Sequence, residues 1–284
     1  MLVLITGAGG QLGRAVARDA ARRRWTVHAA THAELPIDDA TAVQRAVEDV
    51  GPDLVVNCAA WTDVDGCQRD PQRAQRINAD GAGHLAAACA AAGASLLQVS
   101  TDYVFDGTAT EPYRATDPVD PRSAYGRSKL AGERQILDSA VAEHSYIVRT
   151  SWLFGPGGRC FPRTILDAAR AGRPLRVVDD QFGCPTMTVD LAAALLDLSE
   201  SGAAPGIYHA ANRGHTSWRE FAVELLRQTG IAAEVAGMSS AELDRPAPRP
   251  AWSVLDCTKL TAVRGAPLPT WQDALARWLA EEPR

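Results

Sequence analysis

Short apolar runs alternate with longer segments of helical periodicity along the first half of the chain. Residues 2–5 form an all-apolar run, which is typical of a strand buried on both faces of a sheet. Further strands are predicted at residues 25–29, 53–58, 95–99 and 145–149, separated by helices at residues 14–24, 38–50, 72–92 and 123–142. Strands and helices that alternate in this way predict an α/β fold, a Rossmann-like doubly wound parallel sheet with right-handed crossovers.

After Thr150 this alternation loosens. Helices are predicted at residues 161–171, 189–199, 218–229 and 269–281, and short strands at residues 175–178 and 206–209. A rigid proline-rich loop at residues 245–250 lies between two of these helices. We therefore expect a Rossmann domain in residues 1–150 and a smaller C-terminal part in residues 151–284, with about residues 175–210 returning to the sheet.

The composition is that of an ordinary globular protein, with 46% apolar and 22% charged residues in a chain of 284. This length fits one large α/β domain with a small appendix. The net charge of −5 argues against nucleic-acid and membrane-surface partners, which require a basic face. The one basic run, residues 22–24, lies where the first helix is expected to end, and cations are favourable at a helix C-terminus.

The six cysteines are spaced unlike metal ligands or redox pairs. None forms a Cys-x-x-Cys pair, and no spacing of His and Cys resembles a zinc site, so no metal is predicted. The first strand begins at residue 2, which leaves no room for a signal peptide, and no apolar run approaches the roughly 18 residues of a membrane span. A cytoplasmic protein with reduced thiols is the simplest expectation.

A glycine-rich turn follows the first strand and opens the first helix. Its residues Gly7, Gly10 and Gly13, with Gln11 and Leu12 between them, allow the backbone to approach a pyrophosphate that faces the N–H groups of the helix. Glycine spacing alone also fits a structural turn, but the strand before and the helix after favour a dinucleotide site. The spacing is that of short-chain dehydrogenases, so residues 1–150 are expected to bind NAD(P).

The end of the second strand bears on the choice of cofactor. An acid that binds the ribose 2′-hydroxyl is expected there in an NAD site, yet residues 29–32 contain none and the first acid is Glu34. Without that acid a 2′-phosphate is not repelled, which favours NADPH, with NADH possible. Thr31 or His32 is either a phosphate ligand or an ordinary surface residue.

Tyr125 and Lys129 lie four residues apart on the helix predicted after the fourth strand, which places both on one helix face. A cation beside a phenol lowers the phenol pKa. Thr101, which follows the fourth strand, can hold a carbonyl oxygen beside that phenol. With a nicotinamide these three residues can reduce a ketone, in which carbon takes the hydride and oxygen takes the tyrosine proton. Asp102 is either a partner of these groups or a turn residue.

Two further segments lie at the carboxyl ends of the predicted strands, where dinucleotides bind in such sheets. Residues 57–62 end the third strand, and small residues there leave room for a cofactor. Trp152 follows the fifth strand and is either a ligand contact or a core tryptophan. His84, His209 and His215 have no partners at ligand spacing and are expected to be structural.

Together with their neighbours, these motifs resemble the dTDP-4-dehydrorhamnose reductase family of extended short-chain dehydrogenases nearly end to end. The most specific motif is Ser-Thr-Asp-Tyr-Val-Phe-Asp-Gly at residues 100–107. The others lie at residues 7–13, 56–60, 125–133, 149–152, 180–186 and 249–256. The resemblance implies NADPH-dependent reduction of the 4-keto group of dTDP-4-dehydro-L-rhamnose, which yields dTDP-L-rhamnose.

The resemblance also implies roles for individual residues. Tyr125 is implied to be the proton donor, Lys129 to bind the nicotinamide ribose and Thr101 to tune the proton transfer. The implied substrate contacts are Thr101, Asp102, Tyr125 and Trp152, while the C-terminal part holds the base and the phosphates. The expected cofactor contacts are Gly7, Gly10, Gln11, Leu12, Gly13, Ile37, Ala59, Ala60, Trp61, Thr62, Tyr125 and Lys129.

Three positions depart from the family pattern. Pro36 precedes Ile37 where the family often has Asp, which removes a carboxylate contact to the adenine but leaves backbone contacts. Cys160 replaces an Asn before Phe161, and Trp61 replaces a commoner Tyr or His. These changes bear on the identity of the sugar more than on the chemistry. Some family members dimerise through a magnesium site; no acidic cluster indicates that site here, and a homodimer stays open.

Other functions remain as alternatives. The nearest is the same chemistry on another dTDP-ketosugar of antibiotic biosynthesis, such as a dihydrostreptose-type precursor. A non-catalytic, cofactor-binding regulatory subunit would not need Thr101, Tyr125 and Lys129 together. An epimerase or dehydratase that recycles its own NAD would need further acid–base groups and a tightly held cofactor.

Overall fold

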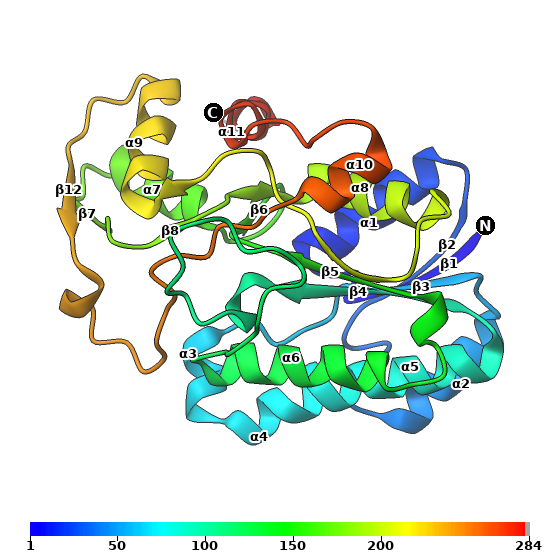
Figure 1. Cartoon of the computed structure of the whole chain (residues 1–284). Helices are drawn as coiled ribbons and strands as arrows, with labels where there is room; N and C mark the ends of the chain where they lie inside the picture. The colour runs from blue at the N-terminus through cyan, green and yellow to red at the C-terminus, as the bar shows by residue number, and fades with distance from the viewer. Residues whose placement is uncertain (282–284) are drawn as a thin grey trace.

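The computed structural model describes residues 1–281 and contains the expected doubly wound sheet (Figure 1). The strands of this sheet are β1 (Leu2–Thr6), β2 (Thr26–Ala30), β3 (Leu54–Asn57), β4 (Ser95–Thr101), β5 (Ser145–Thr150) and β10 (Gly206–His209). Within the described residues these six strands are parallel and lie in the order β10-β5-β4-β3-β1-β2. The chain leaves β1 toward β2 and then crosses to β3 on the other side, so β1 and β3 mark the switch point at which such sheets bind ligands.

Helices cover both faces of the sheet (Figure 1). One face holds α1 (Gln11–Arg22) and α8 (Thr188–Glu200), and the other holds α2 (Ala40–Val50), α5 (Gly81–Ala92) and α6 (Ala124–Leu137). Alternate residues of β1 enter the two cores, because Val3 and Ile5 pack with α1 and α8 whereas Leu4 packs with α2 and α5. The all-apolar run at the start of the chain is therefore a strand buried on both faces, as predicted.

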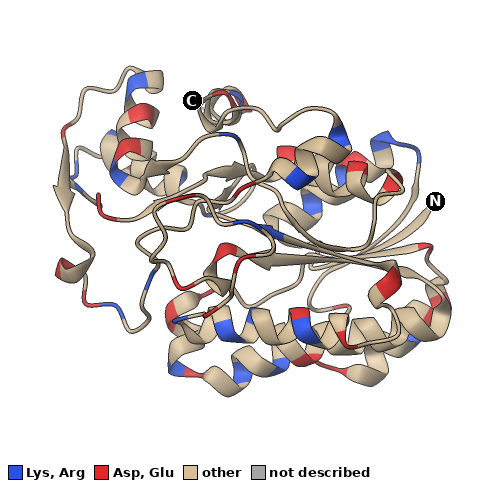
Figure 2. Cartoon of the chain, in the orientation of Figure 1, with Lys and Arg blue, Asp and Glu red and all other residues tan. Residues whose placement is uncertain are grey.

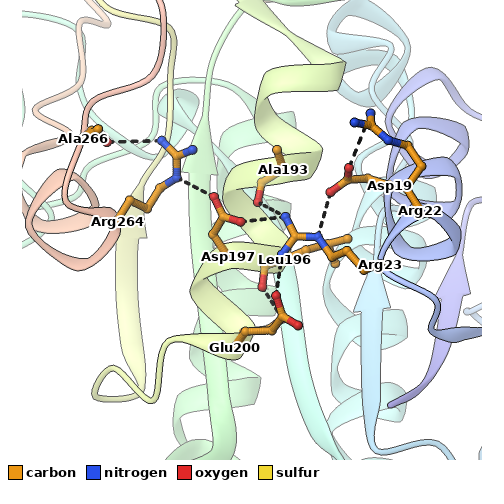
Figure 3. A network of polar contacts seen from close by, with 10 residues as sticks. Asp19, Arg22, Arg23, Ala193, Leu196, Asp197, Glu200, Arg264 and Ala266 are labelled. Carbon is orange, nitrogen blue, oxygen red and sulfur yellow. Dashed lines mark hydrogen bonds and ion pairs between the residues drawn. The ribbon is translucent and has the colours of Figure 1, made fainter.

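The basic run at the end of α1 joins two helices of one layer (Figure 3). Arg23 pairs with Asp19 of its own helix and with Asp197 and Glu200 of α8, at N–O distances of 3.0, 2.6 and 2.5 Å. Arg264, nearer the C-terminus, joins the network through Asp197 at 2.9 Å. The run therefore has a structural role and connects α1 to α8.

The long helix predicted after β3 is interrupted. It comprises α4 (Pro71–Ala74), a π-helical stretch (Gln75–Asp80) and α5, which ends at Gly93 with φ +68°. The π-helical stretch contains Asn78, whose amide nitrogen donates to the Trp61 carbonyl at 3.0 Å and whose amide oxygen accepts from the Trp61 N–H at 2.8 Å. This local irregularity fixes the loop after β3, and a regular periodicity does not reveal it.

The next long helix, α6, is shorter than predicted. It ends at Leu137 and not at residue 142. The Ile136 carbonyl accepts from both the N–H and the hydroxyl of Ser139, at 3.1 and 2.6 Å, which replace the partner that a further helical turn would have given. The helix therefore ends without an unsatisfied carbonyl at that position.

The C-terminal part builds a second core beside the sheet (Figure 1). It contains α7 (Phe161–Arg170), α9 (Trp218–Thr229), α11 (Trp271–Glu281) and a parallel pair, β7 (Leu175–Val178) and β12 (Val235–Met238). The expected return of residues 175–210 to the central sheet is therefore wrong for β7, whereas α8 and β10 do return. Leu175 and Val177 instead bury their side chains in the second core with Val235. The domain boundary at residue 150 stays a prediction.

Acidic and basic residues both occur along the helices of the two layers (Figure 2). The helix α8 carries only acidic residues, Asp190, Asp197 and Glu200, but basic residues of neighbouring elements such as Arg23 pair with them. Among the helices of residues 1–281, none combines the length and the apolar character that a membrane span requires.

Candidate active site

The glycine turn after β1 is packed too closely for side chains. A Cβ on Gly7, which has φ +67°, would lie 2.6 Å from the Ala59 nitrogen, and a Cβ on Gly13 would lie 2.4 Å from the Gly7 carbonyl oxygen. Gly10 precedes α1, and no side chain of the described residues caps this helix. Its first N–H groups are therefore left for an anion, and the turn fits a pyrophosphate.

A cleft of about 520 Å³ lies at the carboxyl ends of the central strands. It brings together most residues predicted from the sequence: Gly10, Gln11, Leu12, Gly13, Ala59, Ala60, Thr62, Thr101, Asp102, Tyr125, Lys129 and Trp152. Gly7 lies behind this surface, because it packs on Ala59. A larger, open groove of about 1270 Å³ between residues 106–120 and 254–268 contains none of them, so the smaller cleft is the candidate site.

Besides Gly7, two predicted cofactor contacts lie outside the cleft lining, Ile37 and Trp61. Ile37 is buried in the core with α2 and α5, and its carbonyl oxygen lies 3.0 Å from Nδ1 of His84. The guanidinium of Arg73 lies over the Trp61 ring, 4.5 Å from its centroid. A role for Ile37 and Trp61 in cofactor binding stays a prediction.

Tyr125 and Lys129 both line the cleft from α6, as their spacing predicts. The Lys129 ammonium donates to the Val99 carbonyl at 2.7 Å. Burial lowers the Lys129 pKa to about 8, although the negative charge of Glu133 raises it. Burial raises the Tyr125 pKa, and a hydrogen bond with Thr101 opposes this only in part. The sequence predicts that the neighbouring cation lowers the Tyr125 pKa, but the pKa is raised, with burial as the largest cause, and the phenol keeps its proton.

Thr101 and Asp102 line the cleft at the end of β4. The Thr101 hydroxyl donates to Oδ1 of Asp102 at 2.9 Å and accepts from the Tyr103 N–H at 3.2 Å. Burial raises the Asp102 pKa to about 6, although hydrogen bonds from Ser253 and Thr101 lower it. The Asp102 carbonyl also accepts from the Phe105 N–H at 3.2 Å. Asp102 is therefore both a partner of the cleft groups and a turn residue.

A buried ion pair, absent from the sequence predictions, lies behind the cleft. Glu133 and Arg149 are 1% and 2% exposed. Nε and Nη2 of Arg149 donate to the two carboxylate oxygens at 3.0 and 2.7 Å, and the Ser100 hydroxyl donates to Oε1 at 2.5 Å. Glu133 follows Lys129 by four residues, and this spacing is the one signal that could have pointed to it.

Two tryptophans form one wall of the cleft. Trp152 has φ +47°, which is uncommon for a bulky residue. Its ring stacks on Trp218 of α9, with centroids 3.5 Å apart and an interplanar angle of 6°. A Cβ on Gly183 would lie 2.5 Å from the Trp152 ring, so this position requires glycine. Trp218 and Arg159, which also lines the cleft, are missed from the sequence because no local pattern relates them to β5.

A second cavity of about 410 Å³ adjoins the cleft. Three residues line both: Val64, Tyr103 and Trp218. The second cavity is also lined by Arg176, Arg245 and Arg249. Arg249 donates to both carboxylate oxygens of Asp65 at 2.6 and 2.8 Å, which fixes its guanidinium. Arg176 also pairs with Glu242 at 2.6 Å, and the planar guanidinium groups of the three arginines are donors suited to phosphate oxygens.

Comparison with known proteins agrees with this geometry. The family model described as RmlD substrate binding domain matches residues 1–283. A dTDP-4-dehydrorhamnose reductase of Streptomyces griseus is 46% identical over 96% of this chain and 91% of its own length. A probable dTDP-4,6-dihydroxy-2-methyloxan-3-one 4-ketoreductase of Streptomyces antibioticus is 39% identical over 96% and 92%. The crystal structure of a dTDP-4-dehydrorhamnose reductase from Bacillus anthracis in complex with NADP is 33% identical, with a TM-score of 0.94 and 99% of both chains covered. The resemblance is confirmed, and the chain belongs to the dTDP-4-dehydrorhamnose reductase family.

Proposed function

We propose that this chain reduces the 4-keto group of a dTDP-4-dehydro-6-deoxysugar with NADPH. The substrate that we propose is dTDP-4-dehydro-L-rhamnose, which yields dTDP-L-rhamnose. The observation that supports this most is the convergence of Thr101, Tyr125 and Lys129 in one cleft beside the glycine turn. Relatives named as reductases and 4-ketoreductases of dTDP-sugars match the chain nearly end to end, which supports the same reaction class.

The cleft residues divide the work of a carbonyl reduction. NADPH, when bound, supplies a hydride to the keto carbon. Tyr125, which burial keeps protonated, donates its proton to the keto oxygen, so that an alcohol forms. The Thr101 hydroxyl, oriented by Asp102, lies beside the phenol and tunes this proton transfer. Lys129 provides a buried positive charge that stabilises the phenolate left behind.

The residues of the N-terminal part fit a dinucleotide. The glycine turn has no room for a Cβ at Gly7 or Gly13, and the uncapped start of α1 offers N–H groups to the pyrophosphate. Lys129 would bind the nicotinamide ribose. The complex of the Bacillus anthracis relative with NADP supports NADPH as the cofactor, with NADH also accepted. Residues 1–150 would thus bind the cofactor.

The sugar nucleotide would bind mainly to residues 151–284. The cavity lined by Arg176, Arg245 and Arg249 adjoins the reacting cleft, so a diphosphate there places an attached sugar near Tyr125. Trp152 would pack on that sugar. This arrangement supports a nucleoside-diphosphate sugar and not a small free ketone.

Another dTDP-ketosugar is the second candidate substrate. The probable 4-ketoreductase of Streptomyces antibioticus matches the chain over nearly its full length, and its name refers to a different sugar. A dihydrostreptose-type precursor belongs to the same class. A regulatory subunit and an NAD-recycling epimerase are less well supported, because the cleft holds the full set of Thr101, Tyr125 and Lys129.

Turnover of the proposed substrate tests this function directly. Purified protein is mixed with NADPH and dTDP-4-dehydro-L-rhamnose, and the loss of nicotinamide absorbance is followed together with the formation of dTDP-L-rhamnose. We expect rapid loss of absorbance with stoichiometric product. Bound NADPH without turnover would contradict this substrate and direct the assay to other dTDP-ketosugars.

Replacing Trp218 with Leu is expected to weaken sugar-nucleotide binding. The stack on Trp218 holds the Trp152 ring in place, and an aromatic pair of this kind is worth about 0.5–1.5 kcal/mol. KM should therefore rise by roughly two- to twelvefold while kcat changes less. Steady-state kinetics measure this split. Trp218→Phe keeps an aromatic partner and should stay close to the unmodified enzyme. An unchanged KM in Trp218→Leu would show that Trp152 does not depend on the stack.

We also propose that the protein acts in the cytoplasm, where its six thiols stay reduced, and that it forms a homodimer, as some family members do. Light scattering on the purified protein gives the mass in solution. Fractionation of the source cells gives the location. A monomer mass would remove the dimer from the proposal without affecting the reaction.

A further inference from the structure

The turn after β2 folds an acidic side chain back onto the end of this strand. The N–H groups of Glu34 and Leu35 donate to the Thr31 carbonyl at 3.1 and 2.9 Å, and Leu35 anchors the turn because it is buried. Oε2 of Glu34 then accepts from both the N–H and the hydroxyl of Thr31, each at 2.8 Å. The Glu34 carboxylate therefore lies at the residue that directly follows β2, although it is three residues further along the sequence.

This position adjoins the glycine turn. The Ala8 N–H donates to the Ala30 carbonyl at 3.0 Å, and a Cβ on Gly9 would lie 3.6 Å from Cγ2 of Thr31. In doubly wound dinucleotide sites an acid at the end of the second strand binds the ribose hydroxyls of the adenosine. The stretch before Glu34 lacks such an acid in sequence, but the turn supplies one in space.

The groups around this point offer little to a 2′-phosphate. The Thr31 N–H and hydroxyl both donate to Glu34, so they are not available to an added phosphate. Residues 31–39 contain no Lys or Arg, and His32 is the only basic side chain among them. The nearby Arg14 guanidinium is already engaged, because it donates to the carbonyls of Gly9 and Gly157.

The Glu34 side chain itself is suited to a ribose hydroxyl. It is exposed, and the hydrogen bonds from Thr31 lower its pKa, so it is ionised at neutral pH. Both hydrogen bonds from Thr31 go to Oε2, and neither goes to the second carboxylate oxygen, Oε1. One carboxylate oxygen is thus fixed by the turn while the other remains for a ligand.

We propose that Glu34 is a cofactor-selectivity residue, whose carboxylate accepts a hydrogen bond from the adenosine 2′-hydroxyl of NADH and repels the 2′-phosphate of NADPH. Glu34 thereby limits the preference for NADPH and makes NADH a competent cofactor. The inference rests on the proposed function only in that the glycine turn binds NAD(P). It does not depend on which sugar is reduced.

Binding to the free protein tests this without turnover. The affinities of NADH and NADPH, and of ADP and adenosine 2′,5′-bisphosphate as probes of the adenosine end, are measured by calorimetry for the unmodified protein and for Glu34→Gln. Gln keeps the size of the side chain and an oxygen that can accept from Thr31, but removes the charge. The matched control is Glu48→Gln, an exposed acid of α2 that bonds to Gln44.

In Glu34→Gln we expect NADPH to bind more tightly relative to NADH, so that the ratio of the NADPH to the NADH dissociation constant falls by about tenfold at low salt. Adenosine 2′,5′-bisphosphate should gain affinity relative to ADP by the same factor. Raising the ionic strength should shrink the difference, because the repulsion is between exposed charges. The control should leave the ratio unchanged. An unaltered ratio in Glu34→Gln, or a shift that does not depend on salt, would overturn the proposal. Failure of the proposed substrate would leave these binding results intact, so the two proposals fail separately.

Discussion

Replacing Tyr125 with Phe is expected to lower turnover by roughly 10²–10⁴-fold, the usual contribution of a positioned acid or base. In the proposed mechanism the phenol oxygen donates a proton to the keto oxygen, and Phe lacks this group. The ring itself should stay in place, since it packs edge-on against Tyr103 with centroids 5.5 Å apart. Cofactor affinity should therefore change little, and single-turnover kinetics with NADPH should show the loss in the chemical step.

The neighbouring Tyr103 provides the matched control. It lines the same cleft and is a phenol close to Tyr125, so Tyr103→Phe removes a hydroxyl from the same environment. We expect this variant to keep most of its turnover. Turnover in Tyr125→Phe equal to that of the unmodified enzyme would remove Tyr125 from the mechanism, whereas equal losses in both variants would point to a general effect of the cleft environment.

The parts of the site that sequence reasoning found are those determined by local geometry. Gly7, Gly10 and Gly13 are recognisable because a turn between a strand and a helix needs close backbone approach at fixed spacing. Tyr125 and Lys129 are recognisable because a spacing of four gives one helix face. The carboxyl ends of parallel strands then meet at one edge of the sheet, and this brings the two motifs into one cleft.

The parts that were missed depend on contacts between distant segments. Trp218 reaches the cleft only because α9 packs in the second core, where its ring meets Trp152. The apolar residues of β7 fit either core, and only the pairing of β7 with β12 places this strand outside the central sheet. Glu34 lies four residues beyond the end of β2 in the sequence, whereas its hydrogen bonds to Thr31 bring its carboxylate next to this end in space.

Removing the charge of Glu133 is expected to destabilise the protein strongly. Its carboxylate is the partner of the Arg149 guanidinium, and both side chains are almost fully buried. Glu133→Gln leaves a buried cation with a neutral partner, and breaking such a pair costs about 3–5 kcal/mol. Urea unfolding of the unmodified protein and the variant measures this difference.

A double variant separates the lost pair from the changed volume. Glu133→Leu with Arg149→Met removes both charges and keeps apolar bulk, so it should recover most of the stability lost in the single variant, because the buried cation is gone. A single variant as stable as the unmodified protein would show that Arg149 finds another partner. If the double variant lost as much stability as Glu133→Gln, the loss would be due to packing and not to the unpaired cation.

The single variant Glu133→Gln should also change the pH dependence of the reaction. Burial lowers the Lys129 pKa to about 8, and the negative charge of Glu133 opposes this. Without that charge the Lys129 pKa falls further, so the protonated lysine is lost at a lower pH than in the unmodified enzyme. If protonated Lys129 supports turnover, the basic limb of the kcat profile of Glu133→Gln moves to lower pH. The profile is measured without urea and at a temperature at which the variant is folded. A basic limb at the unmodified position would show that Glu133 acts on stability alone and that the charge of Lys129 is set by other groups of the cleft.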